Sequence, residues 1–439
     1  MTTPEKVPTR QTATGEHRTF IQHYGSTVLG QGAVLAIGVL TGILSARLLG
    51  PVGRGEFAAI IIWPMGIGTL FLCGIHQAAV FNLGRRLFTV SEIVTSTAVV
   101  ALVQSVLTII FGLSIIPIVF ARYSQTARDL EVIFVLFIPA WFVTAYMGSL
   151  FQGQQDLLRF NIIRLLPPLT NVIGLAGMYF IHSRSLRWAI FSVLAGYAIT
   201  AALGASMIWS KLRPGFKWNP KTIPRLINYG YRTQATTLAS YFNQRIDQLV
   251  LSLFVPPEQL GLYAVAVTLA TAVTVFPAAV GIVTFSRGIG QHSDDAKALI
   301  GRSFRASLIW LAVCCGMLYM LCPFLIRLVF GAAFEGSITA CRILLPGAMM
   351  IGLNQVLYNG ASALGRPGLP SIAEGVSMAL TAIGLYLLVP HYGYIGAAYI
   401  SSLAYTLSFL IMLGLGHWKL GINPRILLLG ELSQFRFPF

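Results

Sequence analysis

The stretch from residue 226 to 254 carries polar and ionisable side chains at helical spacing, inside a run long enough to cross a membrane. Five of them share one helix face, at intervals of four, four, three and four: Arg232, Thr236, Ser240, Asn243 and Asp247. Five more form the adjacent stripe: Gln234, Thr237, Tyr241, Arg245 and Gln248. An ionised side chain at the bilayer centre costs at least about 2.5 kcal/mol. We therefore expect this helix to line a polar cavity.

Asp247 is the sole acid that the sequence places in the middle of a predicted span. A carboxylate at that depth, together with Asn243 and a hydroxyl of Ser401 or Ser402, has the chemistry to bind a proton or a coupling cation such as Na⁺. A structural hydrogen bond across the helix bundle is the other interpretation, and both stay open at this point. No other cofactor and no metal site are expected.

Composition makes the chain a membrane protein. Of its 439 residues, 56% are hydrophobic and 10% are charged, and the mean hydropathy is +0.75. A soluble domain needs roughly a quarter of its residues charged. The net charge of +16 lies in short clusters between apolar runs rather than in a patch with interleaved aromatics, which argues against nucleic acid as a partner.

Apolar runs predict an all-α protein with about twelve spans of roughly 20 residues or more. They are placed at 22–49, 57–82, 92–120, 130–152, 158–181, 187–210, 226–254, 260–285, 302–330, 337–363, 369–390 and 394–416. Of the 30 Lys and Arg residues, 20 fall on the side of the N-terminus, seven on the opposite side and three inside spans. By the positive-inside rule, both termini are predicted to be cytoplasmic.

Three short patterns recur in the same order at offsets of 206, 212 and 209 residues. They pair Pro51-x3-Gly55-x-Phe57-Ala58 with Pro257-x3-Gly261-x-Tyr263-Ala264, Tyr146-x-Gly148-x4-Gly153 with Tyr358-x-Gly360-x4-Gly365, and Ala189-x2-Ser192-x-Leu194-Ala195 with Ala398-x2-Ser401-x-Leu403-Ala404. An offset equal to six spans indicates two parallel bundles related by a pseudo-twofold axis along the membrane normal. The predicted organisation is a disordered tail (1–20), a six-helix bundle (21–210), a basic linker (211–225), a second bundle (226–417) and a short tail (418–439).

Several ordered motifs resemble the polysaccharide exporter branch of the multidrug/oligosaccharidyl-lipid/polysaccharide exporter superfamily. They are Leu48-Leu49-Gly50-Pro51-x-Gly53-x-Gly55, Arg245-Ile246-Asp247-Gln248-Leu249, Gly261-Leu262-Tyr263-Ala264, Leu344-Leu345-Pro346-Gly347 and Ala363-Leu364-Gly365-Arg366-Pro367. The resemblance covers roughly residues 20–416. It implies a V-shaped pair of bundles in a bacterial cytoplasmic membrane, with a cationic cavity and alternating access. It also implies a flippase for polyprenyl-pyrophosphate-linked oligosaccharides of O-antigen, exopolysaccharide or teichoic-acid type.

Three arginines are the candidate cavity cations: Arg232, Arg245 and Arg164. An arginine fork presents paired donors to phosphate oxygens, so Arg232 fits a pyrophosphate ligand. A structural ion pair between Arg232 and Glu374, at similar depth, is an alternative that does not exclude the first. Arg164 is expected either in the cavity or as an interfacial arginine whose head group reaches the membrane surface.

Two other functions compete with export of lipid-linked glycans. A cation-coupled multidrug exporter of the same superfamily needs an acidic cavity in the amino-terminal half, where the sequence places its acids only near span ends. An enzyme is not expected, because no nucleophile elbow, metal-ligand cluster or phosphate-cradling glycine loop occurs. The expected partners are the lipid-linked oligosaccharide, membrane lipid, and the polymerase and glycosyltransferases of the same pathway.

The charge asymmetry predicts the topology. Reporter fusions after Arg86, Lys217 and Arg302 should give a cytoplasmic signal, whereas fusions after Arg128 and Glu258 should report the outside, because an even number of spans precedes the first three. Paired alkaline phosphatase and green fluorescent protein fusions measure both sides independently. A cytoplasmic signal after Glu258 contradicts the even-span arrangement.

Overall fold

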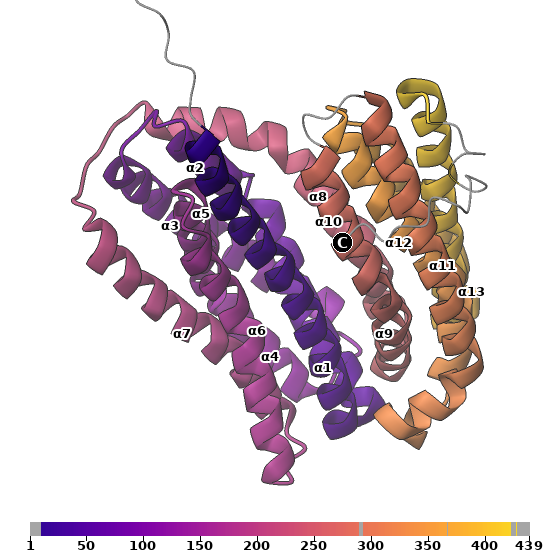
Figure 1. The fold of residues 1–439 in the computed structure, drawn as a ribbon. Helices are drawn as coiled ribbons and strands as arrows, with labels where there is room; N and C mark the ends of the chain where they lie inside the picture. The colour runs from indigo at the N-terminus through magenta and orange to yellow at the C-terminus, as the bar shows by residue number, and fades with distance from the viewer. Residues whose placement is uncertain (1–9, 289–292, 367, 423–426, 428–439) are drawn as a thin grey trace, which may run out of the picture.

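The described part of the chain consists of helices joined by short turns and loops, and no strand occurs in it. The computed structural model describes residues 10–288, 293–366, 368–422 and Leu427, and for 10–31, Ala235, Thr236, Ser240 and Ser293 it describes the backbone alone. Figure 1 shows two groups of helices that lean on each other, α1 to α7 in indigo and magenta and α9 to α13 in orange and yellow. Helix α8, in pink, runs from the first group into the second.

The first group, the N-lobe, contains seven helices. They are α1 (Arg10–Phe71), α2 (Ile75–Gly84), α3 (Val90–Val119), α4 (Gln125–Leu136), α5 (Ile138–Gly153), α6 (Leu157–Phe180) and α7 (Leu186–Leu212). The second group, the C-lobe, contains α9 (Pro257–Thr271), η1 (Ala272–Thr274), α10 (Val275–Gly288), α11 (Ser293–Leu325), the π-helical turn η2 (Ile326–Phe330), η3 (Ala332–Phe334), α12 (Ser337–Ala363) and α13 (Gly368–Leu420). Helix α8 (Thr222–Phe254) joins them.

Two glycines break the longest helices. Gly50 (φ 68°, ψ −179°) divides α1, and Gly393 (φ 55°, ψ −140°) divides α13, each in a backbone conformation that side chains disfavour. The pair α4–α5 bends by 43° at Phe137, where Pro139 follows within the first turn of α5. Each break therefore falls where the sequence gives a local cause for it.

Eight helices of the described chain are long and apolar enough to cross a membrane, and the bent pair α4–α5 makes a ninth if it is one span. The breaks at Gly50 and Gly393 and the polar helix α8 account for the difference from twelve predicted spans. The predicted all-α, multi-pass fold with two lobes is confirmed. Helix α1 begins at Arg10, so helix covers half of the stretch predicted as a disordered tail, and residues 1–9 lie outside the described residues.

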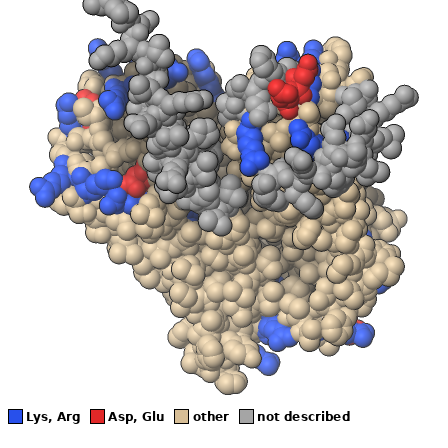
Figure 2. Space-filling model, viewed as in Figure 1, with Lys and Arg blue, Asp and Glu red and all other residues tan. Residues whose placement is uncertain are grey.

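Charged side chains lie at the two ends of the molecule. Figure 2 shows most Lys and Arg at the top of the view and a smaller group at the bottom, with an uncharged band between them. Large apolar side chains are exposed along the helices, among them Leu102, Ile110, Met320 and Leu387. Such a surface is compatible with lipid and not with water.

The two copies of the Pro-x3-Gly repeat pack directly against each other where α1 crosses α9. A Cβ on Gly55 would lie 1.7 Å from the carbonyl oxygen of Pro257, and a Cβ on Gly261 would lie 2.0 Å from that of Pro51. The contact is reciprocal, because each glycine accepts the backbone of the other copy. The apolar core is continuous across this crossing: Phe57 and Tyr263 are both buried in it. We call this contact the glycine crossing.

Polar contacts between the lobes flank the glycine crossing. Arg47 of the N-lobe donates through Nε to the carbonyl of Val329 (2.6 Å) and also to that of Leu328, at the end of η2. Arg122 donates to the carbonyl of Phe254 (2.7 Å), the last residue of α8. Arginines near helix C-termini satisfy carbonyls that lack helical partners. These contacts hold the lobes together at the end predicted to face outward.

Replacing Gly55 by Ala should destabilise the protein, because the added methyl group meets backbone that cannot turn aside. Overpacking of this kind costs about 1–3 kcal/mol. A melting temperature several degrees below the parent is expected for purified Gly55→Ala and for Gly261→Ala. Gly316→Ala is the matched control, since a Cβ there has nothing within 4 Å. Equal melting temperatures for Gly55→Ala and the control would contradict the close packing.

Candidate functional site

Helix α8 contacts both lobes in turn. Near its start, Gly230 meets the turn before α2, where a Cβ would lie 2.5 Å from the Cys73 carbonyl oxygen. One turn later, Gln234 donates to the carbonyl of Thr69 (2.7 Å). In its last third the helix packs against α9 and α13 of the C-lobe, while Ser252 still accepts hydrogen bonds from Trp63 and Tyr123 of the N-lobe. The polar residues predicted for one helix are therefore divided between two environments. The side chains of Thr236 and Ser240 lie outside the described residues.

Asp247 lies in a buried hydrogen-bonded cluster. Its Oδ2 accepts from the Tyr263 hydroxyl at 2.6 Å and from the Ser401 hydroxyl at 3.5 Å, and its Oδ1 accepts from the Gln248 backbone N–H at 2.7 Å. The Tyr263 and Ser401 oxygens are 3.1 Å apart. The three side chains come from α8, α9 and α13, and all are buried. A proton or small cation at this position would contact side chains from α8, α9 and α13 at once.

The predicted partners of Asp247 are placed differently from one another. Ser401 joins the cluster, whereas Asn243 makes no described hydrogen bond to Asp247 and leaves its own buried Oδ1 without a described partner. Tyr263 was not predicted as a partner. The internal repeat could have identified it, because Tyr263 in the second copy matches Phe57 in the first and differs from it by a hydroxyl group. The carboxylate and its tyrosine donor thus belong to the second copy alone.

Arg245 lies two residues from Asp247 with an exposed side chain. Arg54, from α1 in the N-lobe, is close enough for the two like charges to interact. The Nε of Arg54 is buried without a described hydrogen-bond partner. The sequence placed Arg54 in the connection between the predicted spans 22–49 and 57–82, whereas the structure resumes helix directly after Gly50 and places Arg54 within α1. The two arginines bring one positive charge from α1 and one from α8 to the region beside the glycine crossing.

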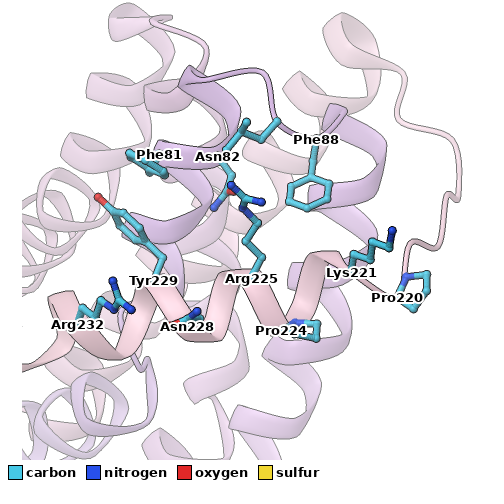
Figure 3. A pocket seen from close by; sticks show the side chains of 11 residues that line it. Phe81, Asn82, Phe88, Pro220, Lys221, Pro224, Arg225, Asn228, Tyr229 and Arg232 are labelled. Atoms are coloured by element: carbon cyan, nitrogen blue, oxygen red, sulfur yellow. The ribbon is translucent and has the colours of Figure 1, made fainter.

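Arg232 lines a pocket near the start of α8, together with two other cations. The pocket encloses about 750 Å³ and is lined by Phe81, Asn82, Leu87, Phe88, Pro220, Lys221, Pro224, Arg225, Asn228, Tyr229 and Arg232. Figure 3 shows α8 along one side and the Phe81, Asn82 and Phe88 side chains opposite. Arg232 contacts Tyr231, with Nε 3.3 Å from the hydroxyl. The alternative ion pair between Arg232 and Glu374 stays a prediction.

Arg164 is half-buried on α6, near a polar cluster at the start of that helix. There Asp156 caps α6 and accepts from Arg159 and Lys211, each at 2.5 Å. Burial opposes the ionised form of Asp156, but the donors Lys211 and Arg159 outweigh it and hold its pKa below the usual range. The cluster ties the start of α6 to the end of α7. Arg164 itself is not brought to Arg232 or Arg245 by any described contact.

One buried acid in the N-lobe was not expected. Glu131, on α4, is 1% exposed, and its Oε2 has no described hydrogen-bond partner. The sequence placed it near a span end, where an acid is ordinarily solvated. Glu56 is also buried, but it accepts from the Ser124 backbone N–H at 3.1 Å. Glu131 therefore has to be considered beside Asp247 as a group that could carry a proton.

Comparison with known sequences gives a family and two relatives. The family profile described as polysaccharide biosynthesis protein matches residues 20–285. A Haloferax volcanii protein assigned as a low-salt glycan biosynthesis flippase is 24% identical over 61% of this chain, which spans about half (55%) of that relative. A Shigella flexneri protein assigned as an O-antigen transporter is 21% identical over 84% of this chain and 90% of its own length.

Comparison with solved structures gives the same fold in transporters of two kinds. An inward-facing multidrug transporter has a TM-score of 0.73 at 12% identity, over 89% of this chain and 94% of its own. A lipid II flippase in an inward closed conformation has a TM-score of 0.72 at 18% identity, over 90% and 87%. At these identities the likeness concerns the fold, and it does not distinguish a cationic drug from an anionic lipid as cargo.

Proposed function

The chain belongs to the polysaccharide biosynthesis protein family, and from this premise we propose that it moves lipid-linked oligosaccharides across the cytoplasmic membrane by alternating access. Both relatives named above are assigned to glycan flipping or transport. The cargo would carry a diphosphate between its polyprenyl chain and its sugars. It would be loaded from the cytoplasmic side and released outside.

The observation that carries the proposal is a pair of arginines whose charges interact: Arg54 on α1, next to Gly55 of the glycine crossing, and Arg245 on the joining helix α8. Bringing two like charges together is unfavourable unless an anion neutralises them. A diphosphate supplies that anion, and arginine presents donors in the geometry that its oxygens accept. The arginine cluster would then bind cargo best when both helices contribute. Arg164 and Arg232 would serve as cations nearer the cytoplasmic end.

The alternative, a cation-coupled multidrug exporter, is favoured by one observation only, the buried Glu131 in the N-lobe. A cationic drug needs acids that it can reach. Glu131 is buried and is the single unsatisfied acid among the described N-lobe residues. The paired arginines would repel such a drug. Lipid-linked glycan is therefore the better-supported cargo.

Alternating access would use the contacts that close one end of the molecule. The glycine crossing and the arginines Arg47 and Arg122 join the lobes at the predicted outer end, as a cytoplasm-facing state requires. Release outside would need these contacts to part while the lobes approach each other at the other end. The proposed bodies are the predicted bundles 21–210 and 226–417, with both termini cytoplasmic. The proposed partners are the polymerase and glycosyltransferases that make and use the cargo.

Arg245→Ala should reduce flipping strongly, because it removes one of the two charges that face the diphosphate. Arg245→Lys should restore only part of the rate, since an ammonium lacks the paired donors. Purified protein in liposomes with a fluorescent lipid-linked oligosaccharide measures the rate directly. Arg302→Gln, which removes an exposed cation of the C-lobe, is the control. A normally folded Arg245→Ala variant with the parent's rate would remove the arginine cluster from the mechanism.

Asp247→Asn should uncouple flipping from the ion gradient, because the amide keeps the shape but can neither take up a proton nor neutralise a cation. Cargo binding should change little. The measurement compares flipping with and without an imposed proton or sodium gradient. Glu131→Gln is the matched control, a buried acid neutralised in the other lobe, and it should keep the gradient response. The opposite result, loss of coupling in Glu131→Gln alone, would place the coupling site in the N-lobe.

A further inference from the structure

The pocket at the start of α8 is lined by positive charges that take part in no described ion pair, as expected of an anion-binding site. Lys221, Arg225 and Arg232 line it, no acid lines it, and the described ion pairs involve none of the three. The nearby acid, Glu92, is already engaged by Lys217 at 3.3 Å and by the cap at Thr89. The three cations therefore stand without compensation from the described residues around them.

The spacing of the cations keeps them together on the helix. Steps of four residues from Lys221 to Arg225 and seven from Arg225 to Arg232 return to the same helix face, after about one and two turns. Phe81, on the facing helix α2, stacks on the Tyr229 ring of α8 at 4.3 Å, with 19° between the ring planes, and the two rings form an apolar wall beside the cations. Figure 3 shows Arg225 and Arg232 projecting from α8 on either side of Tyr229. A cavity of about 750 Å³ lies in the range of small-ligand sites.

We propose that this pocket docks the diphosphate group of a lipid-linked sugar at the cytoplasmic surface, as a site separate from the arginines between the lobes. The inference rests on the proposed function and adds an initial binding site for the cargo. Three uncompensated cations match a diphosphate diester, which carries two negative charges, better than the single charge of a phospholipid phosphodiester. The apolar wall would cover the first isoprene units. Helix α8 then leads from the pocket toward Arg245.

Binding of farnesyl diphosphate to the full-length protein in phosphatidylcholine nanodiscs tests the proposal. The parent should bind farnesyl diphosphate more tightly than farnesyl monophosphate. The double variant Lys221→Gln/Arg225→Gln should raise the Kd for the diphosphate on the order of a hundredfold, since each of the two lost charged hydrogen bonds accounts for about tenfold. Both side chains are exposed, so the variant should fold as the parent does. Arg302→Gln should bind as the parent does.

Unchanged diphosphate affinity in the double variant overturns the site. Loss of farnesyl diphosphate binding when the nanodiscs are made rich in phosphatidylglycerol also overturns it, because the occupant would then be an ordinary anionic phospholipid. Flipping assays on the same preparations separate the two proposals. If the parent binds the diphosphate but flips no lipid-linked oligosaccharide, the proposed function fails and the pocket stands. If the parent flips and the double variant binds and flips equally well, the pocket alone fails.

Discussion

The backbone contact between Gly55 and Gly261 is the constraint on which the arrangement of the lobes depends. Two helices approach this closely only where both lack side chains, and each glycine here accepts the carbonyl of the proline four residues before the other. The contact fixes the depth at which α1 meets α9. Arg54, one residue before Gly55, is thereby brought to Arg245, and Tyr263, two residues after Gly261, is set beside Asp247.

Local pattern and internal repetition were enough to predict most of the fold. Apolar length located the spans, and the repeat indicated two lobes, because both signals depend on the lipid environment and on duplication rather than on detailed packing. The extent of helix was harder to predict. At Gly50 and Gly393 the chain changes direction at a single residue and helix continues on both sides. The sequence around each glycine nevertheless predicts a loop.

The candidate site was predicted in part. Asp247 and Ser401 were expected together and are together, since both lie in the repeated, strongly patterned parts of the chain. Tyr263, Arg54 and Glu131 were missed, because their importance comes from contacts between separate helices or from burial, neither of which hydropathy reports. Arg232 was expected to line a cavity near the cytoplasmic side, and it lines the pocket at the start of α8, where that helix packs along α2.

The Phe57–Tyr263 difference bears on how the chain diverged after its duplication. The two rings occupy equivalent buried positions, and a single oxygen distinguishes them. The first copy makes a purely apolar contact there. The second copy keeps the same packing and adds a hydroxyl that donates to Asp247. A duplicated transporter can in this way assign mechanical work to one half and energy transduction to the other, beginning from one hydroxyl group.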